Sequence, residues 1–129
     1  MANIMVIEDV ADSANLARKI LNKFGHDVIL AANGEEAIQF VSNKDIHLVL
    51  LDLGLPDVDG QTLLGMLRRN YGMTSIPIIV CTAWPSESAK KMAEAYGFDG
   101  YISKPYKVAT FMETVNHYLG QPQNPEITT

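Results

Sequence analysis

Hydrophobic and polar residues alternate along the chain in two kinds of segment. One kind is a short, nearly continuous apolar run rich in β-branched residues, which is typical of strands buried on both faces of a sheet. The five such runs are Ile4–Ile7, Val28–Ala31, Leu48–Leu53, Ile76–Cys81 and Gly100–Ser103. The other kind repeats apolar residues every three or four positions, which predicts amphipathic helices. The five repeats of this kind are Ala17–Phe24, Ala37–Val41, Leu63–Leu67, Ala89–Tyr96 and Val108–Leu119.

This alternation of strand and helix predicts an α/β fold. Short links between the segments favour a parallel sheet that right-handed crossovers cover with helices on both faces. Glycines lie just past four of the helical repeats, where a left-handed residue often ends a helix; they are Gly25, Gly72, Gly97 and Gly120. Asp12 and Ser13 are candidates for capping the first helix. Residues 121–129 hold two prolines and no apolar periodicity, so we expect one domain over 1–120 and a flexible polar tail.

Composition narrows the class of protein. The chain has 129 residues, the size of one domain, and its 47% apolar content supports a packed core. Ten Lys and Arg against fifteen Asp and Glu give a net charge of −5, which argues against contact with nucleic acid or an anionic membrane. A single cysteine, Cys81, excludes an internal disulfide and a Cys-based zinc site. We see no signal peptide and no apolar run near the roughly 20 residues of a membrane span, so we expect a cytoplasmic setting.

Polar residues stand where the predicted strands end. The first strand is followed by Glu8 and Asp9, the third ends in Asp52, the fourth is followed by Thr82, and the fifth by Lys104. In open parallel α/β sheets, ligands bind beyond the carboxyl ends of the strands. We therefore expect three carboxylates, one hydroxyl and one ammonium group to meet at one edge of the sheet.

Three carboxylates close together repel one another, and a hard divalent cation such as Mg²⁺ or Mn²⁺ removes that cost. Such a cation also neutralises an incoming phosphoryl group. Asp52 is the natural nucleophile, because carboxylates form acyl phosphates. The ammonium of Lys104 suits a phosphate oxygen or a carboxylate, and the Thr82 hydroxyl can donate to another phosphate oxygen.

Seven features in chain order resemble a known family. They are the pair Glu8–Asp9, Asp52 at a strand end, Pro56, Gly60, Thr82–Ala83 thirty residues after Asp52, Tyr101, and Lys104–Pro105 fifty-two residues after Asp52. With these features the sequence resembles the response-regulator receiver domains of two-component signalling, of the chemotaxis-regulator type, over about residues 2–120. The resemblance implies a single flavodoxin-like domain: a doubly wound, five-stranded parallel sheet of order 2-1-3-4-5 with five helices.

The resemblance also implies a chemistry at the strand ends. Asp52 would take a phosphoryl group from the phosphohistidine of a sensor histidine kinase or a histidine phosphotransfer protein. Asp9, Asp52 and the carbonyl of Gly54 would bind Mg²⁺ (or Mn²⁺), and Glu8 would act mostly through a metal-bound water.

A switch is implied as well. Lys104 would pair with the phosphoryl group, Thr82 would move toward it, and Tyr101 would turn inward to fill the vacated space. The change would reach the face built from the fourth helix, fifth strand and fifth helix, where an unidentified downstream protein would bind. The protein would then be a signalling switch and not an enzyme, apart from catalysing its own phosphorylation and dephosphorylation.

Four residues beside the predicted site are candidate modulators: Gly54, Ala83, Trp84 and Pro105. Neither Gly54 nor Trp84 has a side chain that could orient an attacking water. We therefore predict that access of water sets the lifetime of the acyl phosphate. For Trp84 two interpretations stay open: an aromatic packed in the core or at the rim, and part of a surface that contacts a partner.

Two other functions compete with the switch. The first is a degenerate receiver that acts as a scaffold independent of phosphorylation, which is disfavoured because every expected polar position is filled. The second is an Asp-nucleophile phosphohydrolase, which needs a second acid two residues after the nucleophile, and here that position is Gly54. Elsewhere, Arg68 and Arg69 are expected to be solvated, and no pair among His26, His47 and His117 has metal-ligand spacing.

Overall fold

The computed structural model describes residues 2–43 and 45–120, and in this part of the chain five strands alternate with five helices. The strands are β1 (Asn3–Ile7), β2 (Asp27–Ala31), β3 (Leu48–Asp52), β4 (Ile78–Thr82) and β5 (Gly100–Ser103). The helices are α1 (Ala11–Lys23), α2 (Gly34–Asn43), α3 (Gly60–Asn70), α4 (Ser86–Tyr96) and α5 (Val108–Leu119). Every predicted strand and helix is present. The predicted tail, 121–129, lies outside the described residues, so the division into domain and tail stays a prediction.

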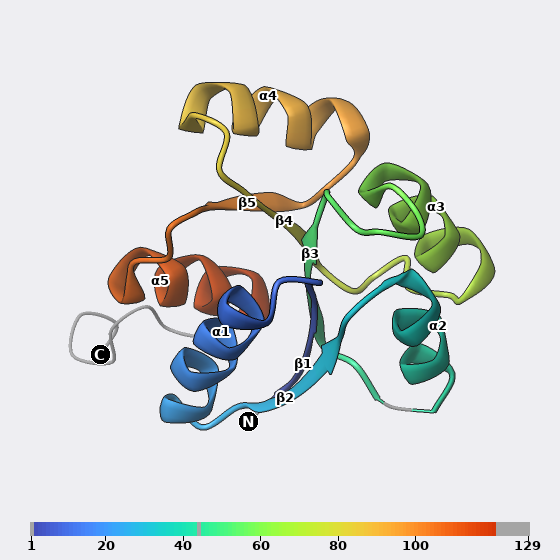
Figure 1. The fold of residues 1–129 in the computed structure, drawn as a ribbon, viewed down its shortest axis with the longest axis horizontal. Coiled ribbons are helices and arrows are strands. Elements are labelled where there is room, and N and C mark those ends of the chain that lie inside the picture. The colour runs from blue at the N-terminus through green and yellow to red at the C-terminus, as the bar shows by residue number, and fades with distance from the viewer. Residues whose placement is uncertain (1, 44, 121–129) are drawn as a thin grey trace.

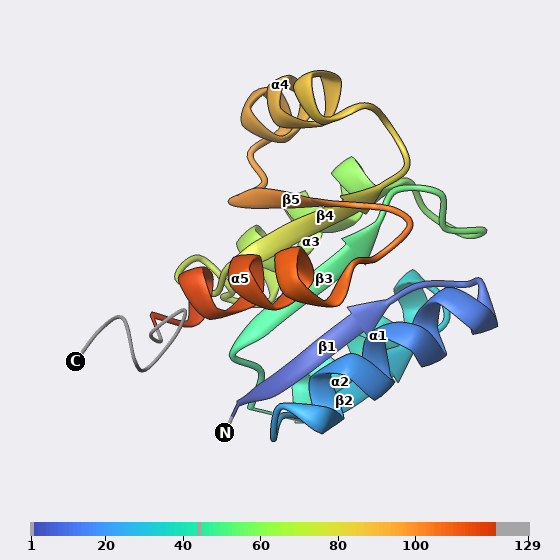
Figure 2. The ribbon, with the colours of Figure 1, turned by 90° about the vertical axis from the view of Figure 1, so that its left-hand side faces the viewer.

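The strands form one parallel sheet of order β2-β1-β3-β4-β5, as the family resemblance implied. Helices α1 and α5 cover one face, and α2 and α3 cover the other, with α4 beside the edge strand β5 (Figures 1 and 2). The predicted α/β, doubly wound fold is therefore confirmed. Among the described residues, no helix combines the length and apolar character needed to cross a membrane.

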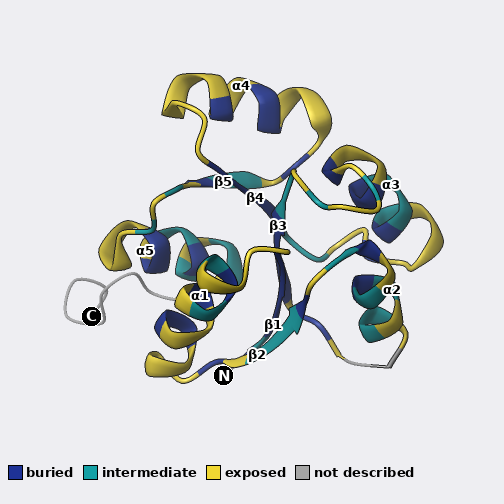
Figure 3. Cartoon of the chain, viewed as in Figure 1, coloured by how far each residue is buried: buried dark blue, intermediate teal, exposed yellow. Residues whose placement is uncertain are grey.

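Each face of the sheet has its own hydrophobic core. Ile4 and Val6 of β1 pack with α1 and α5, whereas Met5 and Ile7 pack with residues of α2, α3 and α4. This split follows from the strand geometry, because successive side chains point to opposite faces. The inner strands β1, β3 and β4 are accordingly buried almost throughout, whereas the edge strands β2 and β5 are only partly buried. The helices are buried on the side that faces the sheet and exposed on the outer side (Figure 3).

The observed ends of the helices agree only in part with those predicted from the sequence. Gly25, Gly72, Gly97 and Gly120 all have positive φ, which confirms the predicted left-handed positions. The prediction that Asp12 or Ser13 caps α1 is wrong. The helix begins at Ala11, its N-cap residue is Val10, and no side chain caps it. Asp12 lies in the first turn instead, where its negative charge interacts favourably with the helix dipole.

Arg68 is not the solvated residue that the sequence suggested. Its Nη2 donates to Asp99 Oδ2 at 2.8 Å and to the carbonyl of Gly97 at 3.4 Å. Its Nη1 donates to the carbonyls of Met73 and Ile76 at 3.1 and 3.3 Å. The guanidinium therefore joins the C-terminal end of α3 to the loop before β4 and to the loop between α4 and β5.

Candidate functional site

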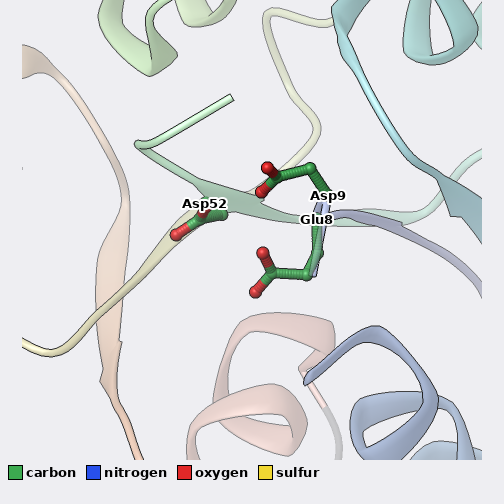
Figure 4. Close-up of side chains that lie close together, drawn as sticks. All are labelled: Glu8, Asp9 and Asp52. Carbon is green, nitrogen blue, oxygen red and sulfur yellow. The ribbon is translucent and has the colours of Figure 1, made fainter. Parts of the chain in front are cut away.

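The ends of β1 and β3 bring three carboxylates together. The two strands are neighbours, and Ile7 pairs with Leu51, so the residues that follow each strand lie side by side. Oxygens of Glu8, Asp9 and Asp52 all lie within 4.8 Å of one another. Figure 4 shows the three side chains converging on the same space. Glu8 is buried, Asp52 is half-buried and Asp9 is exposed, so the cluster is open on one side.

Lys104 reaches this cluster from the end of β5. Its Nζ donates to Glu8 Oε1 at 2.5 Å and to Asp52 Oδ1 at 3.3 Å. The backbone N–H of Lys104 donates to the carbonyl of Thr82 at 2.8 Å, which ties the residue to the end of β4. The structure thus brings together the carboxylates and the ammonium group that the sequence placed at one edge of the sheet.

Burial and the contact between Glu8 and Lys104 shift the pKa of each of these two residues in opposite directions. Burial raises the pKa of Glu8, and the hydrogen bond from Lys104 offsets only part of that effect. For Lys104, burial favours the neutral amine, but the hydrogen bond to Glu8 and the charge of Asp52 outweigh it and raise the pKa. Lys104 is therefore a fixed positive charge at the site throughout the physiological range.

The residues present fit a hard divalent cation. Three carboxylates supply oxygen ligands, and Asp9 faces solvent, from which water could complete the coordination. Gly54 also lies close, since a Cβ at this position would be 3.6 Å from Asp52 Oδ2. A backbone carbonyl at position 54 adds another oxygen of the kind that Mg²⁺ and Mn²⁺ accept.

Thr82 and Trp84 lie together on the other side of Asp52. Thr82 is buried at the end of β4, and its Oγ1 accepts a hydrogen bond from the backbone N–H of Trp84 at 3.1 Å. The Trp84 side chain is 48% exposed, so it is not a core residue. This exposure excludes packing in the core, whereas packing at the rim and contact with a partner both remain open for Trp84. Ala83 and Pro105 are exposed at the same rim.

Tyr101 lies further along β5, paired with Val80 of β4. Its side chain is half-buried and packs against the core between the sheet and α2, α3 and α4. It also borders a groove of about 730 Å³ between the start of α4, β5 and α5. The groove carries mixed polar residues on its α5 side, among them Thr110, Glu113 and His117. The groove lies on the face formed by α4, β5 and α5.

Two carboxylates in the loop after Asp52 make contacts that the sequence did not predict. Asp59 caps α3, accepting from the N–H and the hydroxyl of Thr62 at 2.8 and 2.9 Å. That cap has a local signal, an Asp directly before the helix. Asp57 instead accepts from the backbone N–H groups of Gly34 and Glu35, at 2.9 and 3.1 Å. These partners lie more than twenty positions away in the sequence, so no local pattern indicates the contact.

Comparison with known proteins gives a consistent result. The polar-differentiation response regulator DivK of Brucella anthropi is 31% identical over 118 residues, which cover 92% of this chain and 96% of DivK. A putative response regulator from Chloroflexus aurantiacus has a similar structure, with a TM-score of 0.86 and 28% identity over 93% of this chain and 98% of its own. The chemotaxis response regulator CheY4 of Vibrio cholerae shares the fold, with a TM-score of 0.83, 23% identity, and coverage of 92% and 98%.

The family match covers most of the described residues and all of the site. Residues 4–116 match the response regulator receiver domain. This span includes the acidic cluster, the loop after Asp52 and the ends of β4 and β5. No enzyme family is indicated by the match. On this sequence match and on the sheet order of the fold, the chain belongs to the response regulator receiver domain family.

Proposed function

We propose that this receiver domain is a phosphorylation switch in which Asp52 accepts a phosphoryl group in the presence of Mg²⁺. The donor is the phosphohistidine of a sensor histidine kinase or a histidine phosphotransfer protein, and the setting is the cytoplasm. One observation carries the proposal. Three carboxylates lie within 4.8 Å of one another, and an ammonium group lies 3.3 Å from the one that ends β3.

The transfer is a displacement at phosphorus. A carboxylate oxygen of Asp52 forms the new O–P bond while the N–P bond of the phosphohistidine breaks, and the electron pair of that bond stays on the leaving imidazole nitrogen. Asp9, Asp52 and the Gly54 carbonyl would hold the cation, with Glu8 acting through a water. When bound, Mg²⁺ neutralises the negative charge that the carboxylates and the phosphoryl group bring together. Hydrolysis by water later breaks the O–P bond and regenerates the carboxylate.

The phosphoryl group adds charge and three acceptor oxygens next to groups that can donate to them. Lys104 already lies against Asp52, and Thr82 ends the neighbouring strand with a hydroxyl. Movement of Thr82 toward the phosphoryl group opens space that Tyr101 fills by turning inward. The groove between α4, β5 and α5 changes shape as a result and binds a downstream protein differently in the two states. A coupling free energy of about 1–3 kcal/mol is typical of such switches.

Incubation with a small phosphodonor tests this function. Acetyl phosphate with MgCl₂ should raise the intact mass of the protein by one phosphoryl group, and omission of Mg²⁺ or addition of a chelator should prevent it. The Asp52→Asn variant keeps the size and shape of the side chain but removes the nucleophile, so it should remain unmodified. A wild-type protein that takes up no phosphoryl group, or an Asp52→Asn variant that takes it up equally, overturns the proposal.

A further inference from the structure

The loop between β3 and α3, residues 53–59, has no regular secondary structure and carries Gly54 at the candidate metal site. Its two ends are held by contacts of their own. The N–H of Gly60 donates to the carbonyl of Leu53 at 3.3 Å, and Asp59 caps the helix that follows. These contacts fix where the loop starts and stops, but they leave the path of its middle part undetermined.

The middle of the loop is held by Asp57. One of its carboxylate oxygens accepts from the N–H of Gly34 at 2.9 Å and the other accepts from the N–H of Glu35 at 3.1 Å. Both donors belong to the first turn of α2, where backbone N–H groups have no partner within the helix. The carboxylate therefore connects the loop beside Asp52 to a different element of the fold.

Helix α2 already has capping groups of its own. Asn33 Oδ1 accepts from the N–H of Glu36 at 2.8 Å, and the side chain of Glu36 accepts from the N–H of Ala32 at 2.8 Å. This arrangement resembles a capping box, which is sufficient for many helices. Asp57 thus adds to capping that α2 already has from Asn33 and Glu36. Its specific effect is to hold the loop between β3 and α3 against the start of α2.

The contact also requires glycine at the start of α2. A Cβ at position 34 would lie 2.4 Å from Val58 Cγ1 and 3.4 Å from Asp57 Oδ1. Real Cβ atoms are not found that close to another carbon, so an alanine here would push Val58 or the loop aside. The loop therefore lies directly against the N-terminus of α2, and both Gly34 and Asp57 maintain this approach.

Gly54 and Asp57 are only three positions apart, which limits their separation to about 10 Å of extended chain. On the other side, position 54 lies against Asp52, as the 3.6 Å distance from a Cβ there to Asp52 Oδ2 shows. The anchor at Asp57 therefore restricts where the carbonyl of Gly54 can stand relative to the carboxylate of Asp52.

We propose that Asp57 is a positioning residue for the metal site: by holding the loop against the start of α2, it sets the Gly54 carbonyl at its place beside Asp52. This inference rests on the proposed function, because it assumes that Mg²⁺ binds among Asp9, Asp52 and Gly54. Asp57 itself lies outside the group formed by Glu8, Asp9 and Asp52. Residues that orient metal ligands from outside typically change the affinity for the metal by about 10- to 100-fold when removed.

The experiment is a titration with MgCl₂, followed by amide chemical shifts in two-dimensional NMR, without any phosphodonor. Asp57→Ala should weaken Mg²⁺ binding by about tenfold or more. Asp59→Ala is the matched control, because it removes a helix-capping carboxylate from the same loop without disturbing the link to α2. It should bind Mg²⁺ within about twofold of wild type, although both variants lose a cap.

A second pair of variants tests the same contact without touching Asp57. Gly34→Ala should also weaken Mg²⁺ binding. Adding Val58→Ala to this variant should restore the affinity, because it removes the methyl group that would clash with the new Cβ. Equal weakening in Asp57→Ala and Asp59→Ala, or wild-type affinity in Asp57→Ala, overturns the role of Asp57. Failure of the proposed function is distinct from these results, since the wild-type protein would then show no Mg²⁺-dependent shifts around Asp52.

Discussion

Lys104 Nζ lies 2.5 Å from Glu8 Oε1, so an ion pair joins two residues that are 96 positions apart in the sequence. Glu8 is only 4% exposed, and Lys104 is the cation that compensates its buried charge. The same ammonium lies 3.3 Å from Asp52. Lys104 is therefore positioned to oppose any second cation that enters the cluster, as well as to stabilise an added phosphoryl group.

Replacing Lys104 by alanine should strengthen Mg²⁺ binding. The variant removes one positive charge from within a few ångströms of the cation. Because the site is open to solvent, the loss of this repulsion should raise the affinity for Mg²⁺ by on the order of tenfold. A titration with MgCl₂ followed by NMR measures the effect. Lys107→Ala serves as control, since Lys107 is exposed and outside the acidic cluster. Unchanged affinity in Lys104→Ala would contradict the electrostatic role assigned to Lys104.

We further expect the Lys104→Ala variant to accept a phosphoryl group yet to signal poorly.

The double variant Gly54→Asn with Trp84→Glu should lose its phosphoryl group several-fold faster than wild type. Position 54 lies beside Asp52 and position 84 follows the end of the neighbouring strand β4, and the new side chains can orient or accept a proton from an attacking water. The substitution at 54 is sterically feasible, because a Cβ there makes only an ordinary contact of 3.6 Å with Asp52 Oδ2. Intact mass after removal of the phosphodonor gives the decay rate. Gly54→Ala adds bulk without a polar group and should not accelerate decay; equal rates in all three proteins would refute the prediction.

Thr82→Val should uncouple Trp84 from the proposed phosphorylation site at Asp52. Valine keeps the shape of threonine but removes the oxygen that accepts the N–H of Trp84. The chain has one tryptophan, so its fluorescence reports this position alone. Wild type should change its fluorescence on addition of beryllofluoride and Mg²⁺, Thr82→Ser should respond similarly, and Thr82→Val should respond weakly or not at all. A full response in Thr82→Val would show that the hydroxyl does not carry the change.

The stability of the protein should fall below about pH 6.5 in a way that depends on His26. This side chain is buried, at 5% exposure, and its Nδ1 accepts the N–H of Ala2 at 3.2 Å. Burial lowers the pKa of His26, so between its folded pKa and the unfolded value near 6.5 the unfolded chain binds more protons than the native state. The free energy of unfolding therefore decreases as the pH falls through that window, by at most about 1.4 kcal/mol per pH unit for one proton.

Urea unfolding at several pH values measures this dependence. In His26→Asn, the amide oxygen can accept the same N–H but does not titrate, so this variant should show a shallower fall in stability between pH 7 and pH 5. Equal slopes in the two proteins would assign the acid sensitivity to other groups.

Much of the fold could be predicted from local patterns. Residues of β1 and β4 are apolar on both faces, so their runs read as buried strands, and the repeats in α1 and α5 mark the side that faces the sheet. The acidic cluster was also predictable, because strand ends in a parallel sheet share one edge. Strand limits were less accurate: β4 begins at Ile78, not at Ile76, and includes Thr82.

The contacts that escaped prediction are those between elements distant in sequence. Arg68 stands near the end of a helix and Asp57 stands in a loop, where solvated charges are common, and nothing in the neighbouring sequence distinguishes them from such charges. Their partners are backbone groups of other loops and helices, whose positions are set by the packing of the whole domain. Local sequence determines which helices and strands form, whereas these hydrogen bonds depend on how the helices and strands pack against one another.

The contacts of Arg68 bear on how helix α4 can move. The guanidinium holds the carbonyl of Gly97 and the carboxylate of Asp99, just past the C-terminal end of the helix. The N-terminal end of α4 directly follows Trp84 and Pro85, close to the end of β4. Under the proposed switch, a displacement that preserves the Arg68 contacts would turn α4 about its C-terminal end. Because α4 is about 16 Å long, a small rotation would displace its N-terminal turn, where Ser86 lines the groove.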